Sequence, residues 1–263
     1  MKNYTLVTGA TMGIGYELAK LFAKDKHNLI LVARTNQNLE LVATELQAEG
    51  IDVLTIAKDL FEKDAAAELY EEIKGKNINV DVLVNNAGQG VYGEFVETDL
   101  NRELDIIQLN IGSLIVLTKH FLQDMVTNGT GKILNLASIA GKVPGPYQAV
   151  YHGTKAFVHS FTEAIRNEVR NTGVSITSLL PGATDTDFFH KADMEASKVV
   201  QEGDLADPAD VAKDGYDALM AGKDMVISGF KNKFQVAMSN MTPDSMAANN
   251  MRKMQEPADK KQN

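Results

Sequence analysis

The sequence contains no cysteine and no long hydrophobic run. The absence of cysteine excludes disulfides, thiolate nucleophiles and metal sites built on thiolates. No apolar segment approaches the roughly 20 residues that a membrane-spanning helix needs. The first residues, Met1-Lys2-Asn3-Tyr4, lead directly into an apolar strand pattern without the basic segment and cleavage site of a secretory signal. We therefore expect a cytoplasmic protein with no membrane span.

Positively charged residues are also fewer than negatively charged ones. Lys and Arg together number 26 against 35 Asp and Glu, which gives a formal net charge of -9. A surface this acidic repels nucleic-acid phosphates, so we expect no nucleic-acid partner. The 44% of apolar and 23% of charged residues are typical of a folded globular chain. A length of 263 residues without repeats or Pro/Gly-rich linkers predicts a single domain.

Short apolar runs alternate with longer helical patterns along the chain. The runs lack clean polar alternation, which is typical of parallel strands that are covered on both faces. This order predicts an α/β fold: a single-domain Rossmann fold with a doubly wound parallel sheet. The predicted strands are residues 4–7, 29–32, 53–57, 82–84, 132–136, 175–180 and 225–228. The predicted helices are residues 13–24, 38–49, 65–74, 98–125 with a break around 110–112, and 151–171, whereas the polar tail after Pro257 is expected to fray.

A glycine-rich turn follows the first predicted strand and opens the first helix. It reads Gly9-Ala10-Thr11-Met12-Gly13-Ile14-Gly15. Gly9 permits a tight turn, Gly13 lets the backbone approach a pyrophosphate, and Gly15 lets the helix pack closely on the strand. The helix start offers free N–H groups to phosphate oxygens. The spacing G-x-x-x-G-x-G departs from the general G-x-G-x-x-G fingerprint, so a glycine-rich turn without a ligand is the alternative.

The second predicted strand indicates which dinucleotide binds. Enzymes specific for NAD usually place a carboxylate at its end to bind the ribose 2′-hydroxyl. Here that strand is followed by Ala33-Arg34-Thr35. The Arg34 guanidinium can pair with a 2′-phosphate, which a carboxylate would repel. The sequence therefore favours NADP(H) over NAD(H), and an arginine that is merely exposed at a strand end is the alternative.

Five motifs in order resemble the classical short-chain dehydrogenase/reductase family. After the glycine turn come Asn85-Asn86-Ala87-Gly88, Ser138, the Tyr151-x-x-x-Lys155 pair and Pro181-Gly182. The resemblance covers roughly residues 1–228, and the order of the motifs is far more specific than any one of them. It implies hydride transfer between NADP(H) and a carbonyl or alcohol substrate, catalysed by Asn110, Ser138, Tyr151 and Lys155.

The residue types in this set suit that chemistry. Tyr151 and Lys155 are four apart, so they share one face of a helix. A phenol pKa near 10 is too high for efficient acid–base work at neutral pH, and a nearby ammonium is expected to lower it. Ser138 can donate a hydrogen bond to the substrate oxygen, where negative charge develops. From the resemblance alone, Lys155 also binds the nicotinamide ribose and Asn110 holds a water of a proton relay.

The resemblance assigns the remaining cofactor contacts. Asp59-Leu60 is expected to contact the adenine, with capping of the next helix by Asp59 as the alternative. Asn86, Ala87 and Gly88 are expected to form a backbone wall beside the adenosine ribose. Pro181, Gly182, Ala183 and Thr184 are expected to lie against the nicotinamide carboxamide, and Thr186 near the diphosphate.

Three segments are expected to choose the substrate: residues 89–95, 142–148 and 188–203, the last within a lid at about 186–205. The apolar side chains of Phe188, Phe189 and Met194 suit either a lid over an apolar substrate or plain packing on the sheet. A methionine-rich extension, residues 229–263, can form a helix over the substrate mouth, pack on a partner subunit or simply pack on the domain. The resemblance also implies a homodimer or homotetramer that pairs through the helices at 98–125 and 151–171.

Other functions fit the sequence less well. A non-catalytic NADP(H)-sensing regulator on the same fold is an alternative, although such relatives typically lose the tyrosine or the lysine. A nucleotide-sugar epimerase or dehydratase normally needs a larger carboxyl-terminal domain than residues 229–263 provide. The G-x-S-x-G elbow of a hydrolase is absent. We expect no metal site, because the scattered histidines lack a third ligand at metal spacing. They are His27, His120, His152, His159 and His190.

Overall fold

A single parallel sheet forms the centre of the molecule. The computed structural model describes residues 2–239 and 241–258, so the tail predicted to fray lies, from residue 259 on, outside the described part. The seven strands run in the order β3-β2-β1-β4-β5-β6-β7. They are β1 (Asn3–Thr8), β2 (Asn28–Ala33), β3 (Val53–Ala57), β4 (Asn79–Asn85), β5 (Gly131–Leu136), β6 (Val174–Leu180) and β7 (Met225–Ile227). Every pair is parallel, which confirms the predicted doubly wound Rossmann fold.

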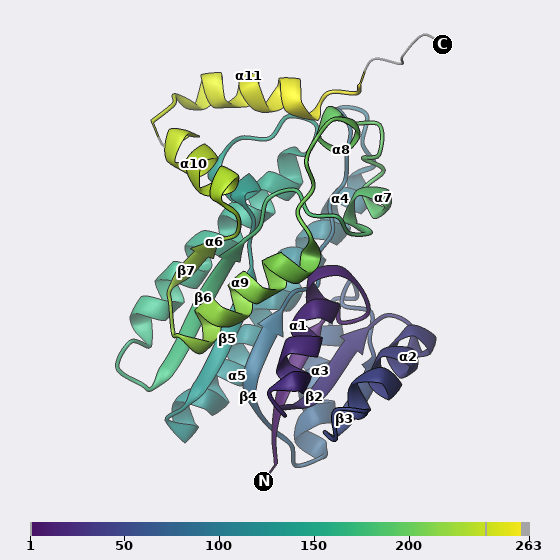
Figure 1. Ribbon diagram of the computed structural model, residues 1–263, viewed down its shortest axis with the longest axis vertical. Coiled ribbons are helices and arrows are strands. Elements are labelled where there is room, and N and C mark those ends of the chain that lie inside the picture. The colour runs from purple at the N-terminus through teal and green to yellow at the C-terminus, as the bar shows by residue number, and fades with distance from the viewer. Residues whose placement is uncertain (1, 240, 259–263) are drawn as a thin grey trace.

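Helices cover both faces of the sheet (Figure 1). On one face, α1 (Gly13–Lys24), α2 (Asn36–Gln47) and α9 (Pro208–Met220) share a core with Val7, Leu31 and Val84 of the strands. On the other, α3 (Ala65–Gly75), α5 (Leu114–Asn128) and α6 (Ala149–Glu168) pack on Leu6, Ile30 and Leu83. Successive strand residues thus face opposite cores, which explains why the strand patterns are apolar throughout.

The long helix predicted at 98–125 is continuous but irregular. It begins at α4 (Leu100–Ile107), where the Asp99 carboxylate accepts the N–H groups of residues 101 and 102. It then widens into a π-helical segment, Gln108–Ser113, before α5 continues. The predicted break at 110–112 is therefore a π-bulge rather than an interruption, and such bulges are frequent at functional sites.

The remaining elements gather at the carboxyl ends of the strands. They are the 3-10 turn Ile139–Lys142, α7 (Phe188–Lys191), α8 (Lys198–Gln201), α10 (Phe230–Ser239) and α11 (Asp244–Gln255). Figure 1 shows α11 crossing this end of the molecule beside α8. The helices in the described ranges are too short or too polar to traverse a lipid bilayer.

Candidate active site

A cavity of about 980 Å³ opens at the carboxyl ends of the strands. It is lined by residues that follow each of the seven strands, from Gly9 after β1 to Gly229 after β7. The strand order reverses between β1 and β4, which is where open α/β sheets bind their ligands. The fold therefore brings loops that are far apart in the sequence into one concave site.

Nearly all of the predicted site residues line this cavity. They are Gly9, Thr11, Met12, Gly13, Ile14, Arg34, Asp59, Leu60, Asn86, Ala87, Gly88, Ser138, Tyr151, Lys155, Pro181, Gly182, Thr184 and Thr186. Gly15 and Asn110 are not among the lining residues and lie behind its wall. They therefore lie behind the residues that would contact a ligand.

The glycine turn needs its glycines for two different reasons. Gly9 and Gly13 have φ values of 65° and 56°, which side chains other than glycine rarely adopt. A Cβ on Gly15 would lie 2.3 Å from the carbonyl oxygen of Gly9, so close packing of α1 on the turn requires its absence. A Cβ on Gly13 would meet the Thr186 side chain at 2.8 Å. The first turn of α1 thus presents its N–H groups to the cavity beneath Thr186.

Hydrogen bonds tie this turn to the end of β4. The Thr8 hydroxyl accepts the N–H groups of Asn86 and Ala87, both at 3.0 Å. The Asn86 amide in turn donates to the carbonyls of Thr8 at 2.9 Å and Gly9 at 3.1 Å. The side chain of Asn86 therefore fixes the turn, and its main chain forms the cavity wall.

Two cations line the far end of the cavity. Arg34 lies 5.7 Å from the Phe61 ring centroid and, within the described residues, has no carboxylate partner. Lys58 follows β3 and pairs with Glu68 at 3.1 Å. The Asp59 carboxylate accepts the N–H of Phe61 at 3.1 Å and does not cap α3, whose N-cap residue is Asp64. The sequence reading missed Lys58, although it precedes Asp59 directly.

The proposed catalytic side chains converge at the opposite end. Ser138 and Lys155 are buried, Tyr151 is half-buried, and all three line the cavity. The Lys155 ammonium lies 5.8 Å from the Tyr151 ring centroid and donates to the carbonyl of Leu136 at 2.7 Å. The Ser138 hydroxyl donates to the carbonyl of Pro181 at 3.3 Å. One helical turn of α6 thus holds a phenol and an ammonium toward the same space.

The pKa values differ from the sequence-based expectation. Burial raises the pKa of Tyr151 to about 12, while a hydrogen bond with Ser138 acts in the opposite direction. Burial also lowers the pKa of Lys155 to about 8. The predicted lowering of the tyrosine pKa by the ammonium is absent in the protein alone, because desolvation is the largest influence on this group and outweighs the hydrogen bond with Ser138. Tyr151 is therefore a neutral phenol, the form that can donate a proton.

Asn110 sits in the π-bulge behind the catalytic residues. Its amide oxygen accepts the N–H of Gln89 at 3.0 Å, and its amide nitrogen donates to the Gln89 carbonyl at 2.8 Å and the Thr154 hydroxyl at 3.0 Å. A Cβ on Gly88 would lie 3.2 Å from the Asn110 amide oxygen and 3.4 Å from Lys155 Nζ. Asn110 therefore joins the bulge, the loop after β4 and α6, next to the lysine.

The loop after β6 closes the catalytic end. The Thr184 hydroxyl donates to the Gly182 carbonyl at 3.0 Å, and the N–H of Ile139 donates to the Pro181 carbonyl at 3.0 Å. A Cβ on Gly182 would meet the Asn232 amide at 2.5 Å, so α10 presses on this loop. The loop is thereby fixed against both Ser138 and the carboxyl-terminal extension.

The expected lid and extension both border the cavity. Phe188 lines it and lies 5.0 Å from the Tyr151 ring, centroid to centroid. Phe189 and Met194 are buried and pack in a small separate core. The segment therefore both lines the cavity and packs on the domain. The extension, which the sequence marked by its methionines, contributes cavity-lining residues from α10 and α11: Lys231, Asn232, Gln235, Met251, Met254 and Gln255.

Ion pairs and hydrogen bonds hold α11 in place. Arg252 pairs with Glu94 at 2.7 Å, and Glu256 pairs with Lys198 at 2.6 Å. The Tyr92 hydroxyl donates to the Gln255 carbonyl at 2.6 Å. Within the single chain, α11 both borders the cavity and packs on the domain.

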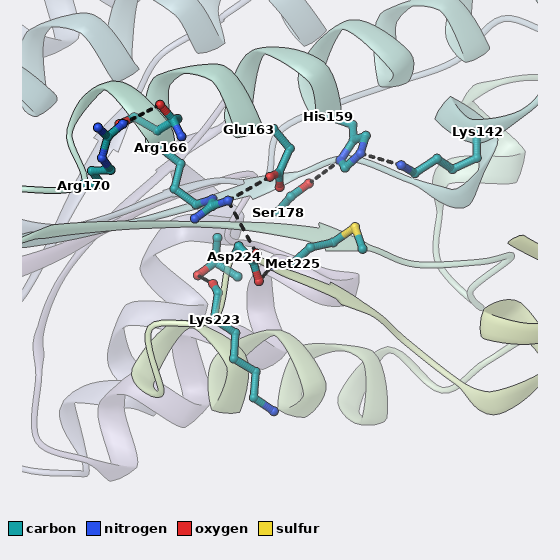
Figure 2. Close-up of polar contacts among 11 residues, drawn as sticks. Lys142, His159, Glu163, Arg166, Arg170, Ser178, Lys223, Asp224 and Met225 are labelled. Atoms are coloured by element: carbon teal, nitrogen blue, oxygen red, sulfur yellow. Dashed lines mark hydrogen bonds and ion pairs between the residues drawn. The ribbon is translucent and has the colours of Figure 1, made fainter. Parts of the chain in front are cut away.

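The histidines make no metal site. Within residues 2–239 and 241–258, no three potential ligands gather in a way that could hold a metal ion. Figure 2 shows His159 in a polar cluster on α6, between Lys142 at 2.5 Å and the Ser178 hydroxyl at 3.4 Å. His152 is buried and donates from Nδ1 to the Val143 carbonyl at 2.9 Å. Both rings make hydrogen bonds within the fold, and His152 also borders the cavity.

Comparisons with known proteins agree with this geometry. Residues 3–197 match the family model described as short chain dehydrogenase. An uncharacterized oxidoreductase of Staphylococcus saprophyticus is 33% identical over 205 residues, which cover 78% of this chain and 88% of that protein. Sulfoacetaldehyde reductase 2 of Chromohalobacter salexigens is 35% identical over 72% of this chain and 75% of its own. A short-chain dehydrogenase from Sphingobium yanoikuyae, solved in complex with NADPH, superposes with a TM-score of 0.81 at 26% identity, covering 92% of this chain and 95% of that one.

Proposed function

The chain belongs to the short-chain dehydrogenase/reductase family, and we propose that it is an NADP(H)-dependent oxidoreductase in which Tyr151 is the general acid and base. The family uses a nicotinamide dinucleotide to act on carbonyl or CH–OH groups. The observation that carries the proposal is one cavity with the glycine turn and Arg34 at one end and Ser138, Tyr151 and Lys155 at the other.

The residues present fit a dinucleotide. The turn at Gly9 and Gly13 leaves no side chain between the backbone and the cavity, and α1 directs the N–H groups of its first turn there. Gly88, Pro181 and Thr184 provide main-chain and small side-chain walls toward the catalytic end. When bound, the nicotinamide supplies or accepts the hydride.

The protein's own groups handle the proton and the developing charge. In reduction, the Tyr151 phenol donates its proton to the substrate oxygen as the carbonyl carbon gains a hydride. Ser138 donates a hydrogen bond to the same oxygen and stabilises its growing negative charge. Lys155 stabilises the resulting phenolate, and the proposed proton relay to solvent runs from Lys155 past its neighbour Asn110. Oxidation of an alcohol reverses each step, with Tyr151 as the base.

The preference for NADP(H) is proposed from charge. Arg34 has no carboxylate partner in the described part of the chain, and Lys58 lines the same end of the cavity. Both cations favour a 2′-phosphate, which a carboxylate at this strand end would repel. The similar Sphingobium yanoikuyae protein was solved with NADPH, which agrees with this preference. The lid at residues 186–205, the cytoplasmic location and a homo-oligomeric state remain predictions from the sequence.

A carbonyl panel tests the proposal most simply. Purified protein is given ketones and aldehydes of varied size with NADPH or NADH, and the loss of nicotinamide absorbance is followed. We expect turnover of at least one carbonyl class, faster with NADPH. Tight NADPH binding with no turnover across the panel would instead support a non-catalytic NADP(H)-sensing regulator.

A further inference from the structure

Two glutamine side chains meet at the substrate end of the cavity. Gln148 is the N-cap residue of α6, and Gln255 is the last residue of α11. Both line the cavity although their exposed fractions are only 4% and 5%. The Gln255 amide nitrogen donates to the Gln148 amide oxygen at 3.3 Å. The carboxyl-terminal extension thus brings a second amide to a residue three positions before Tyr151.

The buried imidazole of His152 fixes how the Gln255 amide is oriented. Its Nδ1 lies 2.9 Å from the Val143 carbonyl, which can only accept, so Nδ1 carries the proton. Burial lowers the pKa of His152, and the ring is neutral with a lone pair on Nε2. The Gln255 amide nitrogen lies 3.0 Å from that atom and must donate to it. Both N–H groups of Gln255 are therefore used, one on His152 and one on Gln148.

This arrangement leaves one donor and one acceptor unpartnered. The amide nitrogen of Gln148 and the amide oxygen of Gln255 are buried and have no hydrogen-bond partner in the described structure. An unpaired buried polar atom costs about 1–3 kcal/mol, so native proteins rarely leave one without a ligand or water. Here two such atoms of opposite polarity belong to adjacent side chains on a ligand cavity.

The backbone around Gln148 is held in an unusual conformation. Tyr147 has a φ of 68°, which is rare for a residue other than glycine. Its carbonyl accepts the N–H of Gly93 at 2.9 Å, and its ring stacks with Tyr92 at 5.7 Å between centroids. The Arg252 guanidinium covers the same ring at 5.0 Å. Contacts from two other segments therefore impose the conformation that directs Gln148 toward the cavity.

The Gln148 amide and the Tyr151 ring share Phe188 as a neighbour. A Cβ placed on Gly90 would lie 2.8 Å from the Phe188 ring edge and 3.2 Å from the Gln148 amide nitrogen, so these two groups approach one point. The Phe188 ring also neighbours the Tyr151 ring. A substrate whose carbonyl oxygen is at Tyr151 therefore reaches the amides with a short extension past Phe188.

We propose that the free amide N–H of Gln148 and the free amide oxygen of Gln255 form a subsite for a hydroxyl group carried by the substrate away from its reacting carbonyl. A hydroxyl accepts from Gln148 and donates to Gln255, so it satisfies both atoms at once. A hydrocarbon would leave both unpaired, and a carboxylate could accept from Gln148 but has no proton to donate to the Gln255 oxygen. This inference rests on the proposed function and narrows its substrate class to hydroxyketones and hydroxyaldehydes.

Matched substrate pairs test the subsite. Linear ketones are compared with analogues that bear one hydroxyl two to five carbons from the carbonyl, at saturating NADPH. For the best analogue, we expect the wild-type kcat/KM to exceed that of the plain ketone by about tenfold or more, because a site built for a hydroxyl penalises its absence. Gln148→Met and Gln255→Met keep the side-chain length and should each reduce this ratio to near one. Asn250→Met, on the exposed side of α11, is the control and should leave the ratio unchanged.

A binding measurement tests the subsite independently of the proposed oxidoreductase function. Titration of the NADP⁺-saturated protein with a diol and the matching mono-alcohol reports the subsite without turnover. If the protein reduced no carbonyl but bound the diol more tightly than the mono-alcohol, and both Met variants abolished this preference, the subsite would be supported and the proposed function overturned. Reduction of plain and hydroxylated ketones at equal kcat/KM, with no diol preference, would overturn the subsite alone. A preference that both variants retain would also overturn it.

Discussion

Arg34 is the residue on which the choice of dinucleotide rests. It lines the cavity at the end of β2, and no carboxylate in the described ranges neutralises it. A charge-assisted contact with a phosphate contributes about 1.5–3 kcal/mol. Lys58 shares this end of the cavity and is expected to retain part of the attraction when Arg34 is replaced.

We predict that Arg34→Asp raises the KM for NADPH by about tenfold to a hundredfold, because the new carboxylate repels the 2′-phosphate. The KM for NADH should change by less than about threefold. Initial rates against both nucleotides measure the two effects, and Arg34→Gln separates loss of attraction from added repulsion. Equal changes for both nucleotides would remove Arg34 from the specificity argument.

At the level of single residues, local motifs were predictable and long-range contacts were not. The turn at Gly9 and the Tyr151–Lys155 pair depend on neighbours within one helical turn, so the sequence already implies their geometry. Gln255 escaped notice because its contact with His152 spans 103 positions. The predicted direction of the Tyr151 pKa shift was wrong, because sequence spacing reveals a nearby lysine but not how far the phenol is desolvated.

Among the elements, α6 carries a second, half-buried histidine one helical turn beyond Lys155. His159 lies between Lys142 of the 3-10 turn, Ser178 of β6 and Glu163 of its own helix (Figure 2). Burial first, and then the positive charge of Lys142, lower the pKa of His159, while Glu163 acts in the opposite direction. The native state therefore holds this imidazole neutral beside an ammonium.

We predict that the free energy of unfolding falls as the pH is lowered from about 6.5. Below about pH 6.5 the histidine of the unfolded chain gains a proton, whereas the histidine of the folded protein resists protonation. The stability that is present above the pKa of the unfolded state is therefore lost as the pH falls through the lower pKa of the folded state. Urea unfolding between pH 5 and pH 8 measures the slope. His159→Gln should reduce the slope; His152, whose pKa burial also lowers, contributes in the same direction. An unchanged slope would exclude His159 as a source.

The helix α11 offers a second test at this scale. It contacts the lid and the loop after β4 through Glu256, Arg252 and Gln255, whereas Arg34 and the glycine turn lie at the other end of the cavity. Truncation after Ser239 keeps α10 but removes Gln255 and two methionines from the substrate end of the cavity. The KM for the carbonyl substrate should therefore rise by about tenfold, whereas the Kd for NADPH should change by less than about threefold. Nicotinamide fluorescence titration and initial rates check both values. A parallel loss of NADPH binding would show instead that the truncation disturbs the whole fold.

Element boundaries followed from the sequence to within a few residues, with informative exceptions. The second helix was expected at 38–49 and forms at Asn36–Gln47, two residues earlier at each end; its N-cap residue is Thr35, a residue type that is favoured at helix starts. The π-bulge at Gln108–Ser113 was anticipated only as a break, since sequence periodicity does not distinguish π from interrupted helix. The position of α11 depends on contacts with α8 and the lid, which no local pattern encodes.

At the scale of the whole molecule, apolar side chains remain exposed on α4 and α6. Leu100, Leu104 and Ile107 recur at helical spacing with exposed fractions of 65%, 54% and 38%, and Phe157 on α6 is 37% exposed. Exposed apolar stripes on the helices expected to pair favour the proposed homo-oligomer.

We predict that the wild-type protein is a dimer or tetramer in sedimentation experiments. Leu104→Glu should shift it toward monomer, because each two-fold contact would bury two added carboxylates. Leu41→Glu, on the exposed face of α2, is the matched control and should not change the sedimentation coefficient. A monomeric wild type would contradict the oligomer.

Reduction of a carbonyl by wild type and by Tyr151→Phe tests the central claim most directly. The variant removes the proton donor and leaves the ring and the cavity wall in place. We predict a loss in kcat of about a hundredfold or more, the range expected for a missing general acid, with the Kd for NADPH within about twofold of wild type. A Tyr151→Phe enzyme that keeps more than about a tenth of the wild-type kcat would contradict the assignment of Tyr151 as the proton donor.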